Sequence, residues 1–302
     1  MHEKNLNWPL EAAWPGNDPD LYWNDGRHNC VLDFHGDLQR ARLVVFSDGN
    51  HHMALQDCVQ AFLEKYPKAN DVFYLTLPPG LYNRILRSGA LRMGNLRLSM
   101  QAHVLIGPDA ALRTWLNNGR LKNITPFAHS LGNVLLVRKG NPKAVQGIAD
   151  LYRDDIRIFI SNPETEKASY MVYRDTLLAL AKSSGLDRQV LKQRLAHPAD
   201  GVIHGQHIHH RESPQALAAD QVDVTPLYYH LALRYLTVFP DKFEIIDLPG
   251  VGLKPCTPEQ VITEYCIGAL DDAGDYGELF VTFMRSEQAG AIYQRHGLGS
   301  CP

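Results

Sequence analysis

Four consecutive apolar residues at positions 43–46 begin the clearest pattern in this chain. The run LVVF is too short for a helix and rich in β-branched side chains, which is typical of a strand buried on both faces. The next four residues read Ser-Asp-Gly-Asn, a sequence that ends strands and caps helices. From residue 51 the apolar positions recur at helical spacing until Pro67. The pattern predicts a strand, a polar turn and a helix, which together form the first half of a βα unit.

Strand-like and helix-like segments continue to alternate to the end of the chain. The pattern predicts strands at 72–77, 103–107, 134–137, 156–160, 224–227, 243–248 and 264–270, and helices at 81–88, 110–117, 148–152, 170–183, 188–195, 214–219 and 278–296, the last with a break near Ser286. Such alternation is typical of parallel α/β sheets, where ligands bind beyond the carboxyl ends of the strands. We therefore expect a ligand to contact the turns that follow strands, at 47–50, 78–81, 108–109, 162–169 and 228–230.

The first 40 residues show neither hydrophobic period. Trp8, Trp14, Tyr22 and Trp23 lie there among prolines. Disordered segments are poor in aromatic residues. We therefore predict an irregular arm at 1–40 whose aromatic side chains pack on the rest of the protein.

Composition and charge exclude several classes of protein. The 302 residues suggest two domains, since a domain averages about 150 residues. A net charge of −3 gives no basic field for nucleic acid, and no apolar run reaches the ~18 residues that insertion into a membrane requires. Five widely spaced cysteines form no CxxC and support neither disulfides nor a zinc site. The start of the chain lacks the pattern of a signal peptide, so we expect a cytoplasmic protein as the sequence stands, or a periplasmic one if a leader has been removed.

Six segments resemble, in order, the type II periplasmic solute-binding proteins, and most closely the molybdate/tungstate-binding receptors of ABC transporters. They are LVVFSDGNHHMALQDCVQAFLEKYP, GLYNRILRSG, HVLIGPDAALRTWLNNGRL, IRIFISNPETEKASYMVYRDTLLAL, VDVTPLYYH and GELFVTFMRSEQAGAIYQRHGL. The resemblance implies an α/β fold of two lobes, each a mostly parallel sheet flanked by helices, joined by two hinge crossovers. Lobe I would hold residues 41–128 and 229–302, and lobe II residues 129–228. A small anion would be trapped as the lobes close.

The resemblance also suggests where the anion binds. The family's oxyanion contacts fall on Asn50, Gly80, Ala168, the His210-Arg211 region and Tyr228. The neighbouring turn residues complete the predicted ligand-binding set, which adds Ser47, Gly49, His51, Leu81 and Ser169. This chain departs from the family pattern at Asn50 and Gly80, where hydroxyl residues are usual. We expect the amide of Asn50 and the backbone N–H of Gly80 to replace those donors.

Several other polar residues allow more than one interpretation. Lys167 could face the anion, although a solvated surface lysine is the slightly favoured interpretation. A carboxylate beside an anion is unfavourable, so Asp48 should point away or favour a cationic group on the ligand. Tyr229 follows Tyr228 at the end of a strand, and by alternation only one of the two should face the cleft. The resemblance selects Tyr228.

A second interpretation of the sequence rests on its 14 histidines. Those at 51, 52, 207, 209 and 210 could supply imidazoles to a transition metal, which makes a metal-binding protein the alternative function. No carboxylate or cysteine completes a shell nearby, so we predict no dedicated metal site. The segment GVIHGQHIHHRESP could contribute a histidine or Arg211 to the ligand, or could be a solvated polar loop before the helix at 214–219. No nucleophile–base pair emerges, so we expect neither an enzyme nor a cofactor. The expected partners are a small anion and an ABC permease, with no nucleic acid, and the protein is expected to be a monomer.

Overall fold

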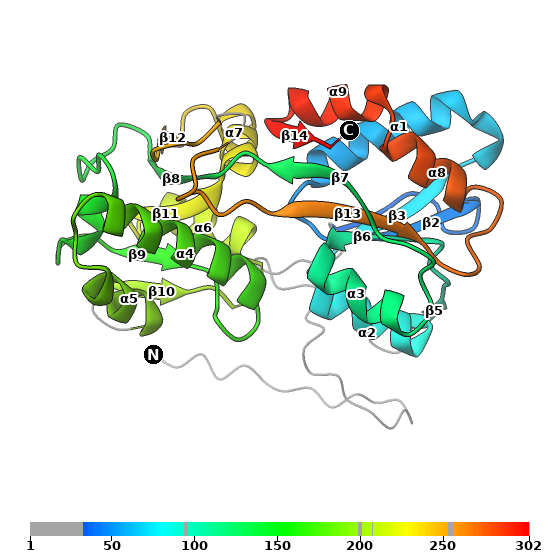
Figure 1. Ribbon diagram of the computed structural model, residues 1–302, viewed down its shortest axis with the longest axis horizontal. Coiled ribbons are helices and arrows are strands. Elements are labelled where there is room, and N and C mark those ends of the chain that lie inside the picture. The colour runs from blue at the N-terminus through cyan, green and yellow to red at the C-terminus, as the bar shows by residue number, and fades with distance from the viewer. Residues whose placement is uncertain (1–32, 94–95, 199–200, 207, 253–255, 302) are drawn as a thin grey trace.

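In the computed structural model, residues 33–93, 96–198, 201–206, 208–252 and 256–301 are described. They form two sheets that lie side by side, each with its own helices (Figure 1). The strands are β1 (Phe34–His35), β2 (Leu43–Ser47), β3 (Val72–Thr76), β4 (Ala90–Met93), β5 (Leu96–Ser99), β6 (Val104–Pro108), β7 (Thr125–Ser130), β8 (Asn133–Arg138), β9 (Ile158–Ile160), β10 (Val202–His204), β11 (Val224–Tyr228), β12 (Phe243–Ile246), β13 (Glu264–Ala269) and β14 (Leu298–Ser300). The helices are α1 (His52–Lys65), α2 (Pro79–Ser88), α3 (Asp109–Asn117), α4 (Lys167–Ser183), α5 (Arg188–Ala196), α6 (His209–Ala218), α7 (Tyr229–Val238), α8 (Gly277–Met284) and α9 (Glu287–Arg295), with short 3-10 turns η2 (Pro67–Ala69) and η3 (Ile148–Tyr152). The predicted α/β class is confirmed.

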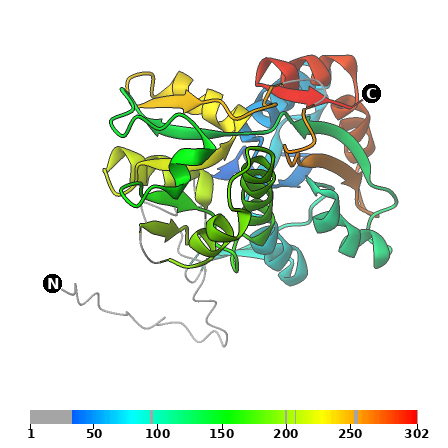
Figure 2. The same cartoon turned by 60° about the vertical axis from the view of Figure 1, so that its left-hand side comes forward.

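The first sheet has seven strands in the order β1-β3-β2-β6-β13-β7-β14. Its central strands are buried on both faces, and successive side chains alternate between two cores. Leu43 and Val45 pack with residues of α1, α8 and α9, whereas Val44 and Phe46 pack with residues of α2 and α3. Figures 1 and 2 show the C-terminal helices in red on the same side of this sheet as α1. The apolar run predicted from residue 43 is therefore the centre of a three-layered half.

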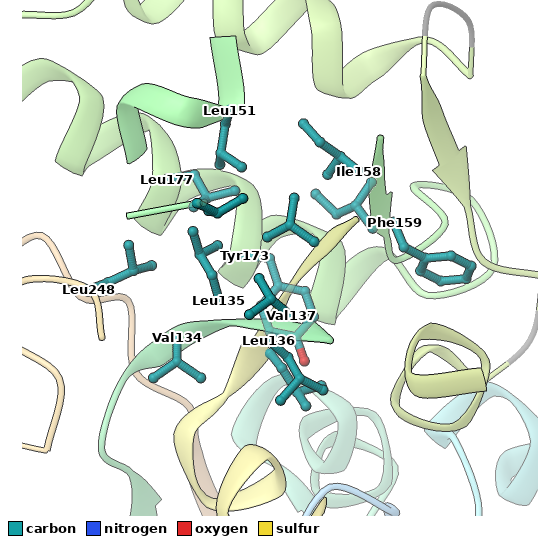
Figure 3. Packing of buried hydrophobic residues seen from close by; sticks show 14 of the residues in the cluster. Val134, Leu135, Leu136, Val137, Leu151, Ile158, Phe159, Tyr173, Leu177 and Leu248 are labelled. Carbon is teal, nitrogen blue, oxygen red and sulfur yellow. The ribbon is translucent and has the colours of Figure 1, made fainter. Parts of the chain in front are cut away.

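The second sheet has five strands in the order β10-β9-β11-β8-β12. Its core includes Val134 and Leu135 of β8, Ile158 of β9, and Tyr173 and Leu177 of α4, all buried (Figure 3). Helix α4 therefore covers one face of this sheet and is fixed there by large side chains. This rigid packing matters for function, because the first turn of α4 reaches the site described below.

Both sheets are mixed, which corrects the expectation of mostly parallel sheets. Strands β2, β3 and β6 run parallel, as do β9, β10 and β11. Strand β13 is antiparallel to both β6 and β7, and β8 is antiparallel to both β11 and β12. The antiparallel strands lie where the chain leaves one sheet for the other and returns.

Among the described strands, the chain passes between the sheets twice, from β7 to β8 and from β12 to β13. The two crossings are hydrogen-bonded together, since the Asn133 backbone N–H donates to Oε1 of Gln260 at 2.8 Å. Gly132 lies between β7 and β8 with φ +92°, and a Cβ there would lie 2.8 Å from the same Oε1. Only glycine suits this close approach.

The return crossing comes later than the sequence analysis placed it. Residues 229–246 were assigned to lobe I, but β12 pairs with β8 and α7 packs against β8, β11 and β12. These residues therefore lie with the second sheet, and the chain returns between residues 247 and 263. The error arose because β11 was taken as the last strand of its lobe, whereas β12 adds an edge strand after it.

Some elements had no clear signal in the sequence. Strand β1 lies in the predicted irregular arm, of which residues 1–32 are outside the described residues. It pairs antiparallel with β3 and places residues 33–40 at the edge of the first sheet. Strands β1, β10 and β14 have only two or three residues, and β4 and β5 form a separate two-stranded hairpin. Segments this short are set by their tertiary partners and not by their own periodicity.

Candidate functional site

A cavity of about 340 Å³ lies between the two halves of the protein. The loops that follow β2, β3 and β6 of the first sheet and β9 of the second sheet form its walls, together with one side chain of α6. The residues that line it are Asp48, Gly49, Asn50, Pro78, Pro79, Gly80, Pro108, Ala110, Ala111, Thr165, Glu166, Lys167, Ala168, Ser169 and His210. The cavity therefore occupies the carboxyl ends of the strands, as the α/β pattern predicted.

Four helices begin at this cavity without a side-chain cap. The residues before their first turns are His51 for α1, Pro78 for α2, Pro108 for α3 and Glu166 for α4, and none of them makes a side-chain capping bond. Among the other described helices, α5 and α9 are capped by side chains, whereas α6, α7 and α8 are not. The first backbone N–H groups of a helix have no partner within the helix and carry partial positive charge. Four such ends around one cavity favour an anion.

Two ionisable side chains at the start of α4 lie in the cavity wall. Lys167, the first residue of α4, supplies a cation next to the helix N-terminus. Glu166 accepts a hydrogen bond at its Oε1 from the backbone N–H of His209 at 2.9 Å. Burial, reinforced by the charge of Glu212, raises the pKa of Glu166 to about 8. At neutral pH the Glu166 carboxyl is therefore mostly uncharged and does not repel an anion.

Asp48, which lines the cavity, forms a buried hydrogen-bonded pair with His51, which lies behind the cavity wall. Oδ1 of Asp48 lies 2.9 Å from Nε2 of His51, whose Nδ1 lies 2.7 Å from the hydroxyl of Tyr293. The hydroxyl of Ser47 also approaches Nε2, at 3.3 Å. A catalytic serine and its carboxylate partner bind opposite nitrogens of the histidine ring, whereas here both oxygens meet the same nitrogen. This arrangement does not provide a proton relay.

His209 and His210, for which a solvated polar loop was one interpretation, are buried instead. Residues 209–213 form the first half of α6, so the predicted helix start at Pro214 is wrong. His209 packs on Tyr173, and burial lowers its pKa to about 3. His210 stacks on His52, with ring centroids 6.1 Å apart, and burial holds its pKa well below the usual value. Both rings are therefore neutral, and His210 cannot act as a cation toward an anion.

No group of three or more metal-ligating side chains occurs in the part of the chain that the structure describes. His207, which belonged to the predicted cluster, lies outside the described residues. His51, His209 and His210 are instead held by packing and hydrogen bonds within the core.

Six of the eleven predicted ligand-binding residues line the cavity: Gly49, Asn50, Gly80, Ala168, Ser169 and His210. The other five, Ser47, His51, Leu81, Arg211 and Tyr228, do not line it. Tyr228 is buried between the rings of Tyr173 and His230, and its hydroxyl lies 2.7 Å from Oγ1 of Thr263. Tyr228 therefore connects the end of β11 to the return crossing.

Sequence reasoning did not place Thr165, Glu166, Ala110 or Ala111 in the site, although the turns at 108–109 and 162–169 were expected near it. Glu166 gave no signal of its own, because an acidic residue in a polar loop is typical of a solvated surface. Its burial results from the approach of α6, which the sequence does not show. Lys167, interpreted as a surface lysine, is indeed exposed and also lines the cavity.

Arg211 connects the two halves of the protein at a different point. Its Nη2 donates to Oδ1 of Asp33, which also accepts from Oγ1 of Thr76 at 3.3 Å. Asp33 precedes β1 in the first half, and Arg211 belongs to α6 in the second. Burial raises the pKa of Asp33 to about 7, although the charge of Arg211 opposes this rise. The arginine predicted to bind the anion thus bridges the halves instead.

We expect Arg211→Ala to lower the free energy of unfolding by about 1–2 kcal/mol at pH 8, because it leaves the Asp33 carboxylate buried without its cation. The penalty should shrink at pH 5, below the folded pKa of about 7, where Asp33 is already neutral in the folded state. Urea unfolding at both pH values measures the effect, with Arg211→Lys as the variant that keeps the charge. Equal losses at pH 5 and pH 8 would contradict the role of the ion pair.

Comparisons with known proteins agree with this architecture. The family model of the bacterial extracellular solute-binding proteins matches residues 43–299. The thiosulfate-binding protein of Escherichia coli is 35% identical over 71 residues, a match that spans 24% of this chain and 20% of that protein.

Two solved structures share the fold at low identity. The sulfate-binding protein SubI of Mycobacterium tuberculosis has a TM-score of 0.63 at 15% sequence identity, covering 85% of this chain and 86% of that one. The periplasmic molybdate-binding protein of Azotobacter vinelandii has a TM-score of 0.56 at 14% identity, covering 86% of this chain and 99% of that one.

No described helix of this chain has the length and apolar character of a membrane span. The match over residues 43–299 and the two-lobed architecture show that this chain belongs to the family of bacterial extracellular solute-binding proteins.

Proposed function

We propose that this protein binds a small anion in the cavity between its two lobes and presents it to an ABC permease or a sensor. The two lobes are those built on the seven-stranded and the five-stranded sheet. One observation carries the proposal: four uncapped helix N-termini and Lys167 surround a single cavity. Backbone donors from both lobes can reach one ligand there, so binding stabilises the closed arrangement.

The candidate ligands are an oxyanion such as molybdate or tungstate, and a small organic acid. The similar proteins named for thiosulfate, sulfate and molybdate support an anion. A volume of about 340 Å³ is at the lower end of the range for small-molecule sites and has room for an organic acid. The family description supports a site of action outside the cytoplasm and a binding role without catalysis. We propose that the protein works as a monomer.

A thermal-shift screen of tag-free protein tests this proposal. A ligand at 100 times its dissociation constant should add about 2.7 kcal/mol to the free energy of unfolding, which raises the melting temperature clearly. The panel contains molybdate, tungstate, sulfate, thiosulfate, phosphate and small carboxylates, with Zn²⁺ and Ni²⁺ as cations. A response to anions is expected. A response to the metals alone would contradict the proposal.

Replacing Lys167 should weaken the binding of the anion and leave the fold intact. Lys167→Ala removes the one cation in the cavity wall among the described lining residues, and we expect affinity to fall about three- to tenfold. Lys182→Ala is the matched control, because Lys182 is exposed in the last turn of the same helix. Isothermal titration of both variants with the tightest anion of the panel compares them. Equal affinities would place the anion away from the start of α4.

A further inference from the structure

The wall of the proposed anion cavity also includes a residue with a buried acceptor that no described group satisfies. Asp48 lines the cavity and is only 1% exposed. Its Oδ2 has no hydrogen-bond partner among the described residues. A carboxylate oxygen can only accept hydrogen bonds, and a buried acceptor without a partner is unfavourable. Within the described part of the chain this atom lacks a donor, and a ligand in the cavity could supply one.

The Asp48 carboxylate is fixed in its orientation by a hydrogen bond. Its Oδ1 is fixed at 2.9 Å from Nε2 of His51, and the His51 ring is held in turn by Tyr293 at 2.7 Å. The backbone N–H of Asp48 donates to the carbonyl of Ile106 in the neighbouring strand at 3.2 Å. The buried hydroxyls of Tyr82 and Tyr265 also lack partners, so neither of them satisfies Oδ2. The carboxylate is thus held through Oδ1, and its backbone is held by the neighbouring strand.

We propose that the ligand is an anion that also carries a hydrogen-bond donor, which it places on Oδ2 of Asp48. The class comprises hydroxy acids, amino acids and oxyanions that retain an O–H group. This inference rests on the proposed function, since it takes the same cavity to be the anion site. The negative end of the ligand faces the helix N-termini and Lys167, and its donor faces Asp48. One ligand thereby binds both the positively charged groups and the Asp48 acceptor of the cavity wall.

Asp48 should distinguish, by affinity, anions that the helix N-termini alone would bind equally well. Sulfate, thiosulfate and molybdate are fully deprotonated at pH 7 and have no donor for Asp48. They would leave Oδ2 unpaired beside a further negative charge. Monohydrogen phosphate has the tetrahedral shape of sulfate but keeps one O–H group, and lactate differs from propionate by one hydroxyl. We expect the donor-bearing member of each pair to bind about tenfold to hundredfold more tightly.

Isothermal titration of the unmodified protein with these two pairs at pH 7 is the first test. A preference for phosphate over sulfate, or for lactate over propionate, supports the inference. Sulfate, thiosulfate, molybdate or propionate binding as tightly as the donor-bearing ligands would overturn it, while anion binding itself would stand. If no anion of either kind binds, the proposed function fails and this inference fails with it.

A substitution at position 48 should reverse the preference. Asp48→Asn presents an amide that can donate to an oxyanion, so sulfate should gain at least tenfold relative to phosphate. Asp109→Asn is the control, because Asp109 lies in the first turn of α3 but does not line the cavity. A ratio of sulfate to phosphate affinity that stays unchanged in folded Asp48→Asn would overturn the role of Asp48. If that variant does not fold, the comparison of ligand pairs on the unmodified protein decides.

Discussion

Gly49→Ala is expected to reduce anion affinity at least tenfold, because the cavity wall has no space for a side chain at this position. A Cβ there would lie 2.8 Å from the carbonyl oxygen of Thr76 and 3.2 Å from Cε1 of His210. Thr76 ends β3 in the first lobe, whereas His210 belongs to α6 in the second. The extra methyl group must therefore displace either the ligand loop or the facing lobe. Overpacking of this kind also costs about 1–3 kcal/mol of stability.

Gly80→Ala is the matched control for this prediction. Gly80 lines the same cavity, but a Cβ there has no heavy atom within 4 Å. We expect Gly80→Ala to keep the fold and to change anion affinity by less than about threefold, as surface substitutions usually do. Titrations are run well below the melting temperature of each variant, so that a loss of affinity is not a loss of folded protein. If both alanine variants bind like the unmodified protein, the contact between Gly49 and α6 has no part in forming the site.

The sequence predicted those parts of the fold that depend on local periodicity. Residues 43–47 alternate between two cores, and the helix after them begins at His52, close to the predicted turn. The break near Ser286 is confirmed, since Ser286 caps α9 with a bond to the N–H of Ala289. These features depend on residues within one or two turns of each other, which is the range over which a pattern can be recognised.

The parts that sequence reasoning missed depend on contacts between distant segments. Arg211 carries a positive charge that suits an anion, but Asp33, 178 residues earlier in the chain, is its partner. The segment HIHH is polar in composition, yet Ile208, His209 and His210 are buried because α6 packs between the lobes. Sequence pattern therefore predicted the loops that line the cavity and did not show which of their charged side chains are already paired within the protein.

Anion affinity should fall as the pH rises above about 8, because Glu166 then becomes ionised in the cavity wall. Its pKa is raised to about 8 by burial and by Glu212, so its charge appears only above that pH. If the ionised form excludes the anion, affinity drops about tenfold for each pH unit above the pKa. Glu166→Gln should bind equally well from pH 7 to 9.5. Lactate and sulfate keep a constant charge over this range and serve as probes in isothermal titration.

The raised pKa of Glu166 also affects the stability of the protein, and the folded and unfolded pKa values fix the sign of this effect. The unfolded chain releases the Glu166 proton near 4.5, whereas the folded protein keeps it until about pH 8. The folded state therefore binds the extra proton between these values, and its stability falls as the pH rises from about 4.5 to 8. Glu166→Gln should remove this part of the fall in stability, whereas Glu164→Gln, at an exposed position of the same loop, should keep it.

The affinity measurements have a contradicting outcome of their own. If the unmodified protein binds each of lactate and sulfate equally well at pH 7 and pH 9.5, Glu166 is not near the bound anion. Helix α4 then contributes to the site only through Lys167 and its backbone.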